Sequence, residues 1–275
     1  MAISTSKHLR LGVSTKGHSR LGTSIDKHPR RIVLANRPEK VFRPAGVSPK
    51  LVYRGGPLLE AVNVITVYWG SEWNNPQLNP SPSDLDAYFD YIVTSSLIDQ
   101  LSEYNKNGYT IGHGKHGGSV PITDTEPGGS VSDTDIQFML QHEIMLGNLP
   151  PFDPNTLYFV FLPPGTSISM GGGASCLSFC GYHEHINGQI YYAVMPFPDC
   201  PGCSGLGGNN DLFSALTVIA SHELCEAITD PIPGQGFYDD TFGEIGDICE
   251  QKGNIKTVGN YIVQLEWSNK KGKCV

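Results

Sequence analysis

The sequence predicts an α/β (α+β) fold in which a mixed sheet is flanked by helices. Runs of branched and aromatic residues alternate along the chain with segments of helical periodicity. Hydrophobic residues make up 39% of the 275 residues, which is enough for a sizeable core. The 32 glycines and 20 prolines favour a loop-rich body over a helical bundle. No apolar run approaches the roughly 18 residues that span a bilayer, so we expect no transmembrane segment.

The N-terminal residues 1–45 differ in composition from the rest of the chain. Residues 1–40 hold nine Lys and Arg against two acidic residues, a net of +7, and the remaining residues carry −15, which gives −8 in total. A degenerate repeat of Ser, Thr, Gly and basic residues predicts a disordered tail or propeptide, and it lacks the apolar region of a secretory signal. We expect a single domain over residues 46–275, whose acidic charge disfavours nucleic acid as a partner.

The first half of this domain contains one predicted strand and two predicted helices. Residues 62–69 are rich in branched and aromatic side chains and predict a strand. Ser83 can cap a helix over 84–104, which has an apolar stripe. After a Gly-rich stretch, Ser132 or Asp133 opens a second helix that ends near residue 146.

The second half is predicted to contribute three strands and one helix. Residues 157–162 are a continuous apolar run closed by two prolines, which is typical of a buried strand, and 190–195 are similar. A helix covers about 210–229 and ends at Asp230-Pro231. Residues 261–267 alternate as a late strand.

The helix at 212–228 carries the chemistry that the sequence predicts. It is apolar around most of its circumference, which indicates a buried helix, yet it contains His222, Glu223 and Glu226. His222 and Glu226 lie one turn apart on one face. Buried ionisable groups cost several kcal/mol unless they are paired, protonated or bound to a cation. This HExxE pattern predicts a zincin-like active-site helix with His222 and Glu226 as Zn²⁺ ligands and Glu223 as general base on metal-bound water.

A third ligand must come from another segment, and the acidic stretch 238–250 follows closely. Glu244 lies 18 residues after Glu226, and Asp247 is placed either to bind the metal or to orient a ligand. Asp230, Asp239 and Asp240 are alternatives. A structural Ca²⁺ held by carboxylate oxygens is a further possibility for this loop.

The His-Glu dipeptide alone is weak evidence, because it occurs twice more. The pair beginning at His142 is followed one turn later by Leu146, and the pair beginning at His183 by Asn187, neither of which suits a metal site. A buried His–Glu salt bridge remains the competing interpretation of the 222–226 segment. A nucleophilic pair of Cys225 and His222 is a remote alternative.

Six segments occur in order along the chain: 53–59, 176–183, 200–203, 222–226 (HELCE), 229–231 (TDP) and 244–250 (EIGDICE). Together they resemble the EXORDIUM (phosphate-induced protein 1) family of plant cell-wall and apoplastic proteins and their microbial relatives. The resemblance covers about residues 50–275 and excludes the tail. It implies a shared polar set of His222, Glu223, Glu226, Glu244 and Asp247, and an extracellular or cell-wall protein with a role in growth or stress responses. Cys225 departs from the pattern, where a small residue such as Ala is expected.

Seven cysteines lie in the last hundred residues. The spacing of the first four permits either a four-thiolate zinc site, with His183 and His185 as further ligands, or disulfides. The family resemblance favours disulfides, including one between Cys249 and Cys274, and hence an oxidising compartment. Cys225 is the unpaired thiol. The six disulfide candidates are Cys176, Cys180, Cys200, Cys203, Cys249 and Cys274.

These observations predict a zinc-dependent metallopeptidase that hydrolyses a peptide or protein substrate. The alternative is a non-catalytic secreted EXORDIUM-like protein in which the polar cluster is structural. A metal-binding glycan or wall-associated module is a third hypothesis.

Overall fold

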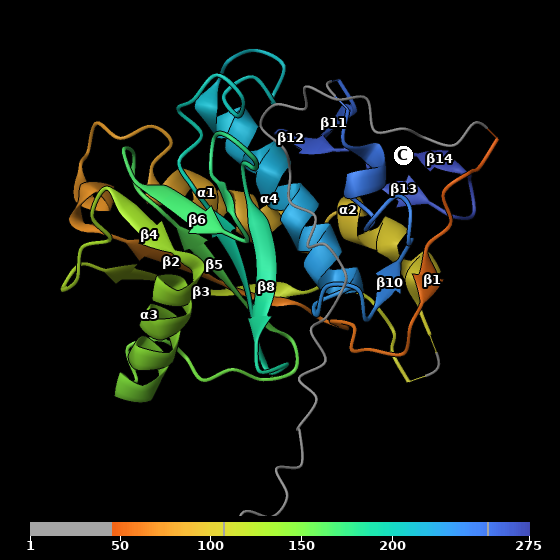
Figure 1. The fold of residues 1–275 in the computed structure, drawn as a ribbon, viewed down its shortest axis with the longest axis horizontal. Coiled ribbons are helices and arrows are strands. Elements are labelled where there is room, and N and C mark those ends of the chain that lie inside the picture. Colours follow the sequence, from red (N-terminus) through yellow and green to blue (C-terminus); the bar gives the residue numbers. More distant parts are fainter. Residues whose placement is uncertain (1–45, 107, 252) are drawn as a thin grey trace, which may run out of the picture.

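The computed structural model describes residues 46–106, 108–251 and 253–275, so the predicted basic tail lies outside the described residues. A five-stranded sheet with the order β3-β2-β5-β9-β8 forms its centre (Figure 1). The first four strands are parallel, and β8 pairs antiparallel with β9 at the edge, which confirms the predicted mixed sheet. The strands are β2 (Asn63–Trp69), β3 (Lys115–Ile122), β5 (Thr156–Phe161), β8 (Tyr182–Ile186) and β9 (Ile190–Met195).

Helices cover both faces of this sheet (Figure 1). The three central strands β2, β5 and β9 are largely apolar on both sides, as expected where a sheet is buried on both faces. Phe159 and Phe161 pack in the core shared with α1 and α4, whereas Tyr158 and Val160 pack in the core shared with α3. The helices are α1 (Pro82–Ile92), α3 (Asp133–Leu146) and α4 (Leu212–Thr229).

The helix predicted over 84–104 is wrong as a single element. Ser81, not Ser83, caps α1 in a capping box with Asp84, and α1 ends at Ile92. The Ser95 hydroxyl then accepts a hydrogen bond from the Leu97 backbone N–H, which starts a new short helix. A second α-helix, α2 (Ser96–Asp99), and a 3₁₀ helix, η2 (Gln100–Tyr104), follow.

The Gly-rich stretch 105–130 contains β3, which the sequence did not predict. Gly117 allows this close pairing, because a Cβ there would overlap the Asn63 side chain on β2. Strand β8 was also missed, whereas the strands at 62–69, 157–162 and 190–195 and the helices near 133–146 and 210–229 are confirmed.

Short sheets complete the fold around the central one. A three-stranded sheet of β4 (Ser130–Ser132), β6 (Ser167–Met170) and β7 (Gly173–Ala174) lies on the α3 side. Strand β12 (Tyr261–Gln264) packs along α4. The predicted strand at 261–267 is therefore shorter than expected, because it ends at Gln264 and a separate strand, β13 (Trp267–Ser268), follows. A short 3₁₀ helix, η3, spans Asp247–Cys249. The remaining pairs are β1 (Val52–Tyr53) with β10 (Phe237–Tyr238), β11 (Ile255–Val258) with β12 (Tyr261–Gln264), and β13 (Trp267–Ser268) with β14 (Lys273–Cys274).

Three disulfides join six of the seven cysteines, as predicted. The sequence separations of 24, 23 and 25 residues close loops that each contribute about 3 kcal/mol in the chain-entropy model. The four-thiolate zinc alternative is wrong, since those sulfurs are bonded to one another. Three disulfides suggest an oxidising environment. The bonds are Cys176–Cys200, Cys180–Cys203 and Cys249–Cys274.

Helix α4 is the most hydrophobic helix of the described part of the chain. By length and composition it is the one helix there that could cross a membrane, yet 83% of it is buried inside the fold. Asp211 caps its start by accepting from the Ser214 backbone N–H at 2.8 Å.

Candidate metal centre

The middle of α4 presents the HExxE residues to the interior. His222, Glu223 and Glu226 are each 1% exposed. The one-turn spacing places the His222 Nε2 atom 3.1 Å from the Glu226 Oε1 atom. The two side chains predicted as metal ligands therefore meet, as the spacing requires.

The segment after α4 brings Asp247 to the same point. One ligand atom from each of His222, Glu226 and Asp247 lies within 4.8 Å of the other two. The Asp247 backbone N–H donates to Glu226 Oε1 at 3.1 Å, and the Asp247 carboxylate accepts from the Glu244 backbone N–H at 3.1 Å. Asp247 thus completes a set of three possible metal ligands with His222 and Glu226. Glu244 is outside this set and contacts it through its backbone N–H, which is bonded to Asp247.

The other acidic candidates for a third ligand bind elsewhere. Asp230 accepts backbone N–H groups of the turn after α4, from Gly234 and Gln235 among others. Asp239 accepts backbone N–H groups of its own turn, and Asp240 forms an exposed ion pair with Arg54. These three carboxylates organise loops and lie outside the candidate groups of metal ligands found in the described residues.

His183, on the edge strand β8, is part of this centre, and the sequence analysis did not place it there. Its Nδ1 atom lies 3.3 Å from Glu223 Oε2 and 3.5 Å from Glu226 Oε2. Its Nε2 atom lies 3.4 Å from Glu244 Oε1. Because β8 and α4 are 39 residues or more apart at these positions, no local spacing in the sequence could have indicated the contact.

Gln264 on β12 orients the His222 imidazole. The Gln264 side-chain NH₂ donates to the Gly246 carbonyl at 2.8 Å, so its Oε1 atom faces His222 Nδ1 at 3.2 Å. The Gln264 oxygen thus accepts the proton on His222 Nδ1, which leaves Nε2, the atom that faces Glu226, as the one available to a metal ion. Gly246 is needed here, because a Cβ would lie 2.5 Å from His222 Nδ1.

The buried charges shift one another's pKa values. Burial raises the pKa of Asp247 to about 8, and the Glu226 carboxylate adds to this shift. Burial likewise raises the pKa of Glu223 and, more strongly, that of Glu244. Burial alone would raise the pKa of Glu226 too, but His222 and His183 outweigh it and lower that pKa to about 2.

Both imidazoles favour a positive charge at this site. Burial opposes protonation of His222 and His183, but the neighbouring carboxylates outweigh it and raise both pKa values well above the usual one. The main contributor is Glu226 for His222 and Glu244 for His183. The same negative potential would stabilise a bound cation.

Two carboxylate oxygens in the centre have unused hydrogen-bonding capacity. Glu223 Oε1 and Glu244 Oε1 are buried without a hydrogen-bond partner among the described residues. An unsatisfied buried acceptor costs about 1–3 kcal/mol. Coordination to a metal ion would satisfy such atoms, and imidazole with carboxylate is a donor set that Zn²⁺ accepts. The residues present therefore fit a metal ion.

Cys225 is next to this centre in sequence, but it does not suit catalysis. Its side chain is fully buried, and burial raises the pKa of the thiol well above its usual value. A protonated thiol is a poor nucleophile. This geometry gives no support to the Cys225–His222 alternative.

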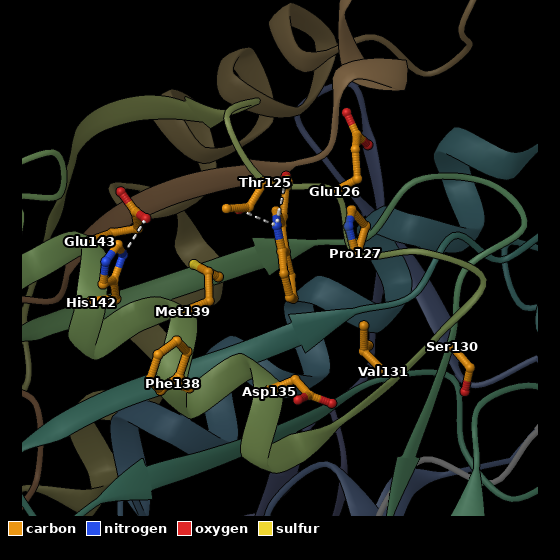
Figure 2. Close-up of a pocket in the computed structure, with 11 residues that line it drawn as sticks. Thr125, Glu126, Pro127, Ser130, Val131, Asp135, Phe138, Met139, His142 and Glu143 are labelled. Atoms are coloured by element: carbon orange, nitrogen blue, oxygen red, sulfur yellow. Dashed lines mark hydrogen bonds and ion pairs between the residues drawn. The ribbon is translucent and has the colours of Figure 1, made fainter.

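The opposite face of the sheet carries the second His-Glu pair that lies on a helix. Figure 2 shows His142 and Glu143 on α3 at one end of a cavity of about 550 Å³. His142 Nδ1 lies 3.0 Å from Glu143 Oε1, and the Asn148 side-chain NH₂ donates to Glu143 Oε2 at 2.7 Å. Both carboxylate oxygens of this pair are thus satisfied without a metal. The cavity is also lined by Trp69, Thr125, Phe138 and Met139.

Comparison with family models, with curated proteins and with solved structures found no significant match for the chain. The EXORDIUM resemblance accordingly remains a prediction that rests on the motifs.

Proposed function

We propose that this protein is a zinc-dependent peptidase of the HExxE kind, with His222, Glu226 and Asp247 as the residues that hold the ion. The observation that carries the proposal is the convergence of these three donors within 4.8 Å of one another. A buried salt bridge needs two partners, whereas this centre gathers two imidazoles and four carboxylates. When bound, Zn²⁺ supplies Lewis-acid polarisation of a carbonyl and lowers the pKa of water.

Glu223 is the residue proposed to move the proton. Its Oε2 atom lies 3.3 Å from His183 Nδ1, which fixes the carboxylate, while Oε1 has no hydrogen-bond partner in the described structure. Glu223 takes a proton from water and returns it to the leaving amine. Gln264 acts as a positioning residue, because it holds the His222 ring in the tautomer that binds through Nε2.

The second candidate function is a closed structural metal centre in a non-catalytic secreted protein of the EXORDIUM kind. The observation that favours it is burial: of the six side chains in the centre, Asp247 is the most exposed at 8%. Structural zinc sites are closed by their ligands, whereas catalytic sites keep one position open. An extracellular or cell-wall location, which fits the three disulfides, belongs to both proposals.

Metal analysis and peptide hydrolysis distinguish these functions. We expect the purified protein to bind Zn²⁺ and to cleave members of a peptide library, and Glu226→Ala to lose metal and activity together. Glu223→Gln should keep the ion at His222 and abolish hydrolysis. His142→Gln, in the pair on α3, is the matched control and should change neither property.

The outcomes separate the two functions clearly. Hydrolysis retained in Glu223→Gln would remove this residue from the base role. Metal binding without hydrolysis in the wild-type protein would establish the structural centre, and no metal binding at all would refute both.

A further inference from the structure

The candidate metal centre contains two groups of donors. The first group is His222, Glu226 and Asp247, and the second is His183, Glu223 and Glu226. Within each group, one donor atom from every residue lies within 4.8 Å of the others. The second group joins the edge strand β8 to α4, and the HExxE motif does not account for it.

Glu226 belongs to both groups and uses a different oxygen for each. Its Oε1 atom lies 3.1 Å from His222 Nε2, and its Oε2 atom lies 3.5 Å from His183 Nδ1. A carboxylate that directs its two oxygens to two imidazoles in this way has the geometry of a bridging ligand. Enzymes with two metal ions place them about 3.5–4 Å apart, a distance that a bridging carboxylate can span.

The charge of the centre is also compatible with two divalent cations. Four buried carboxylates converge here, and in the described part of the chain no Lys or Arg forms an ion pair with them. Metal ions would displace the protons that the raised pKa values hold in this centre, and four ionised carboxylates with two neutral imidazoles would match the charge of two divalent ions. The four are Glu223, Glu226, Glu244 and Asp247.

Two side chains beside His183 have donor atoms to spare. Glu223 Oε1 and Glu244 Oε1 are fully buried without a hydrogen-bond partner among the described residues. Glu244 Oε1 lies 3.4 Å from His183 Nε2, so it flanks the second group. The corresponding carboxylate on α3, Glu143, has both oxygens bonded. One residue of the second group, Glu223, therefore has an unpartnered oxygen, and Glu244 flanks this group on the Nε2 side of His183.

We propose that the protein binds a second divalent cation of the Zn²⁺ or Mn²⁺ class through His183, Glu223 and Glu226, with Glu226 bridging it to the first ion. The proposal rests on the proposed function, because it takes the ion at His222 as given. Imidazole and carboxylate donors suit these borderline and hard ions. Glu223 binds through Oε2 and keeps Oε1 for the proton transfer described above.

The test is the metal stoichiometry of the full chain. The purified protein is stripped with a chelator, titrated with Zn²⁺ by calorimetry and analysed by mass spectrometry for metal content. We expect about two equivalents for the wild type and about one for His183→Gln. His185→Gln, two residues further along β8 and outside both groups, is the matched control and should keep two.

Loading with Mn²⁺ gives a second readout that needs neither activity nor a variant. Two ions bridged by Glu226 are magnetically coupled, so the electron paramagnetic resonance spectrum should change from that of an isolated ion as the second equivalent binds.

Each outcome decides the proposal. One equivalent in the wild type with an isolated-ion spectrum would overturn the second site and leave the proposed function intact. Two equivalents that persist in His183→Gln would place the second ion elsewhere and overturn the assignment. No binding in the wild type would overturn the proposed function as well.

Discussion

Helices α3 and α4 lie on opposite faces of the same sheet, and each carries a His-Glu dipeptide in a different setting. On α3, Glu143 accepts hydrogen bonds at both oxygens, from His142 and Asn148, all within residues 142–148. On α4, Glu223 keeps an unpartnered oxygen and contacts His183 on β8, and Asp247 joins the neighbouring His222 and Glu226. A His-Glu dipeptide therefore forms a candidate metal site only where distant segments of the chain supply further donor atoms.

Removal of metal should have the largest effect, and it should affect only one of these helices. A ligand at about 1,000 times its dissociation constant stabilises a fold by about 4 kcal/mol, so chelation should lower the free energy of unfolding by this order. Hydrogen exchange should accelerate in α4 and in residues 244–250, while α3 keeps its protection. Equal acceleration in both helices would contradict a centre confined to α4.

Loss of the disulfide between Cys249 and Cys274 should have the next largest effect. This bond holds the segment that follows Asp247 to β14, with a sequence separation of 25 residues. We expect the Cys249→Ser, Cys274→Ser double variant to lose about 3 kcal/mol of unfolding free energy in urea denaturation. The matched comparison is the Cys176–Cys200 pair, which closes a loop of similar length outside the 244–250 segment.

The result of interest is how metal affinity responds to these two changes. Removal of the Cys249–Cys274 bond should weaken Zn²⁺ binding at His222, Glu226 and Asp247, whereas removal of the Cys176–Cys200 bond, whose loop contains His183 instead, should leave the affinity of that group unchanged. Equal metal affinity in both variants would show that the 244–250 segment needs no anchor.

Substitution of Gln264 by Leu should weaken metal binding without removing any ligand. The variant loses the acceptor that holds the His222 proton on Nδ1, and changes to such supporting residues cost about 10–100-fold in metal affinity. Gln141→Leu on α3 is the matched control, because the Gln141 side chain bonds only within its own helix. A Gln264→Glu variant should restore part of the affinity, and an unchanged affinity in Gln264→Leu would remove Gln264 from the positioning role.

The two helix caps should show the smallest effects, and these should be similar. Ser132 caps α3 and Asp211 caps α4, so Ser132→Ala and Asp211→Ala should each cost about 1 kcal/mol of unfolding free energy. Hydrogen bonds from Ser214 lower the pKa of Asp211 below its ordinary value of 3.8. Both costs should depend on pH, because hydrogen bonds from Ser132 likewise lower the pKa of Asp135 in the α3 capping box.

The contribution of the Asp211 charge to stability should therefore be fully present above pH 3.8 and lost as the pH falls through the lower folded pKa. A difference in stability between the wild type and Asp211→Ala that persists unchanged in strong acid would contradict this.

The sequence predicted those residues of the candidate metal centre that lie close together along the chain. The one-turn interval of His222 and Glu226 is a property of any α-helix, so their meeting followed from the pattern. Asp247 could be found because it lies in the acidic segment just after α4. His183 and Gln264 were missed, since each comes from a strand whose position depends on the sheet topology.

The fold was predictable to a similar extent. Continuous apolar strands such as β5 and β9 can be predicted from the sequence, because burial on both faces requires apolar residues throughout. Strand β3 contains Gly117 and Gly118, and its pairing with β2 depends on close approach of the two backbones, which propensity does not reveal. The short helix that follows the break after Ile92 starts at the Ser95 hydroxyl, which accepts from the Leu97 backbone N–H. The apolar periodicity over 84–104 did not reveal this cap, because Ser95 also fits the interior of a helix.

The most direct test of a metal centre built from these groups is X-ray absorption spectroscopy of the zinc-loaded protein, with Glu226→Ala and Glu143→Ala alongside. We expect a first shell of nitrogen and oxygen at about 2.0–2.2 Å, with imidazole scattering and no sulfur, that is lost in Glu226→Ala and unchanged in Glu143→Ala. A sulfur shell, or a spectrum that Glu226→Ala leaves intact, would contradict it.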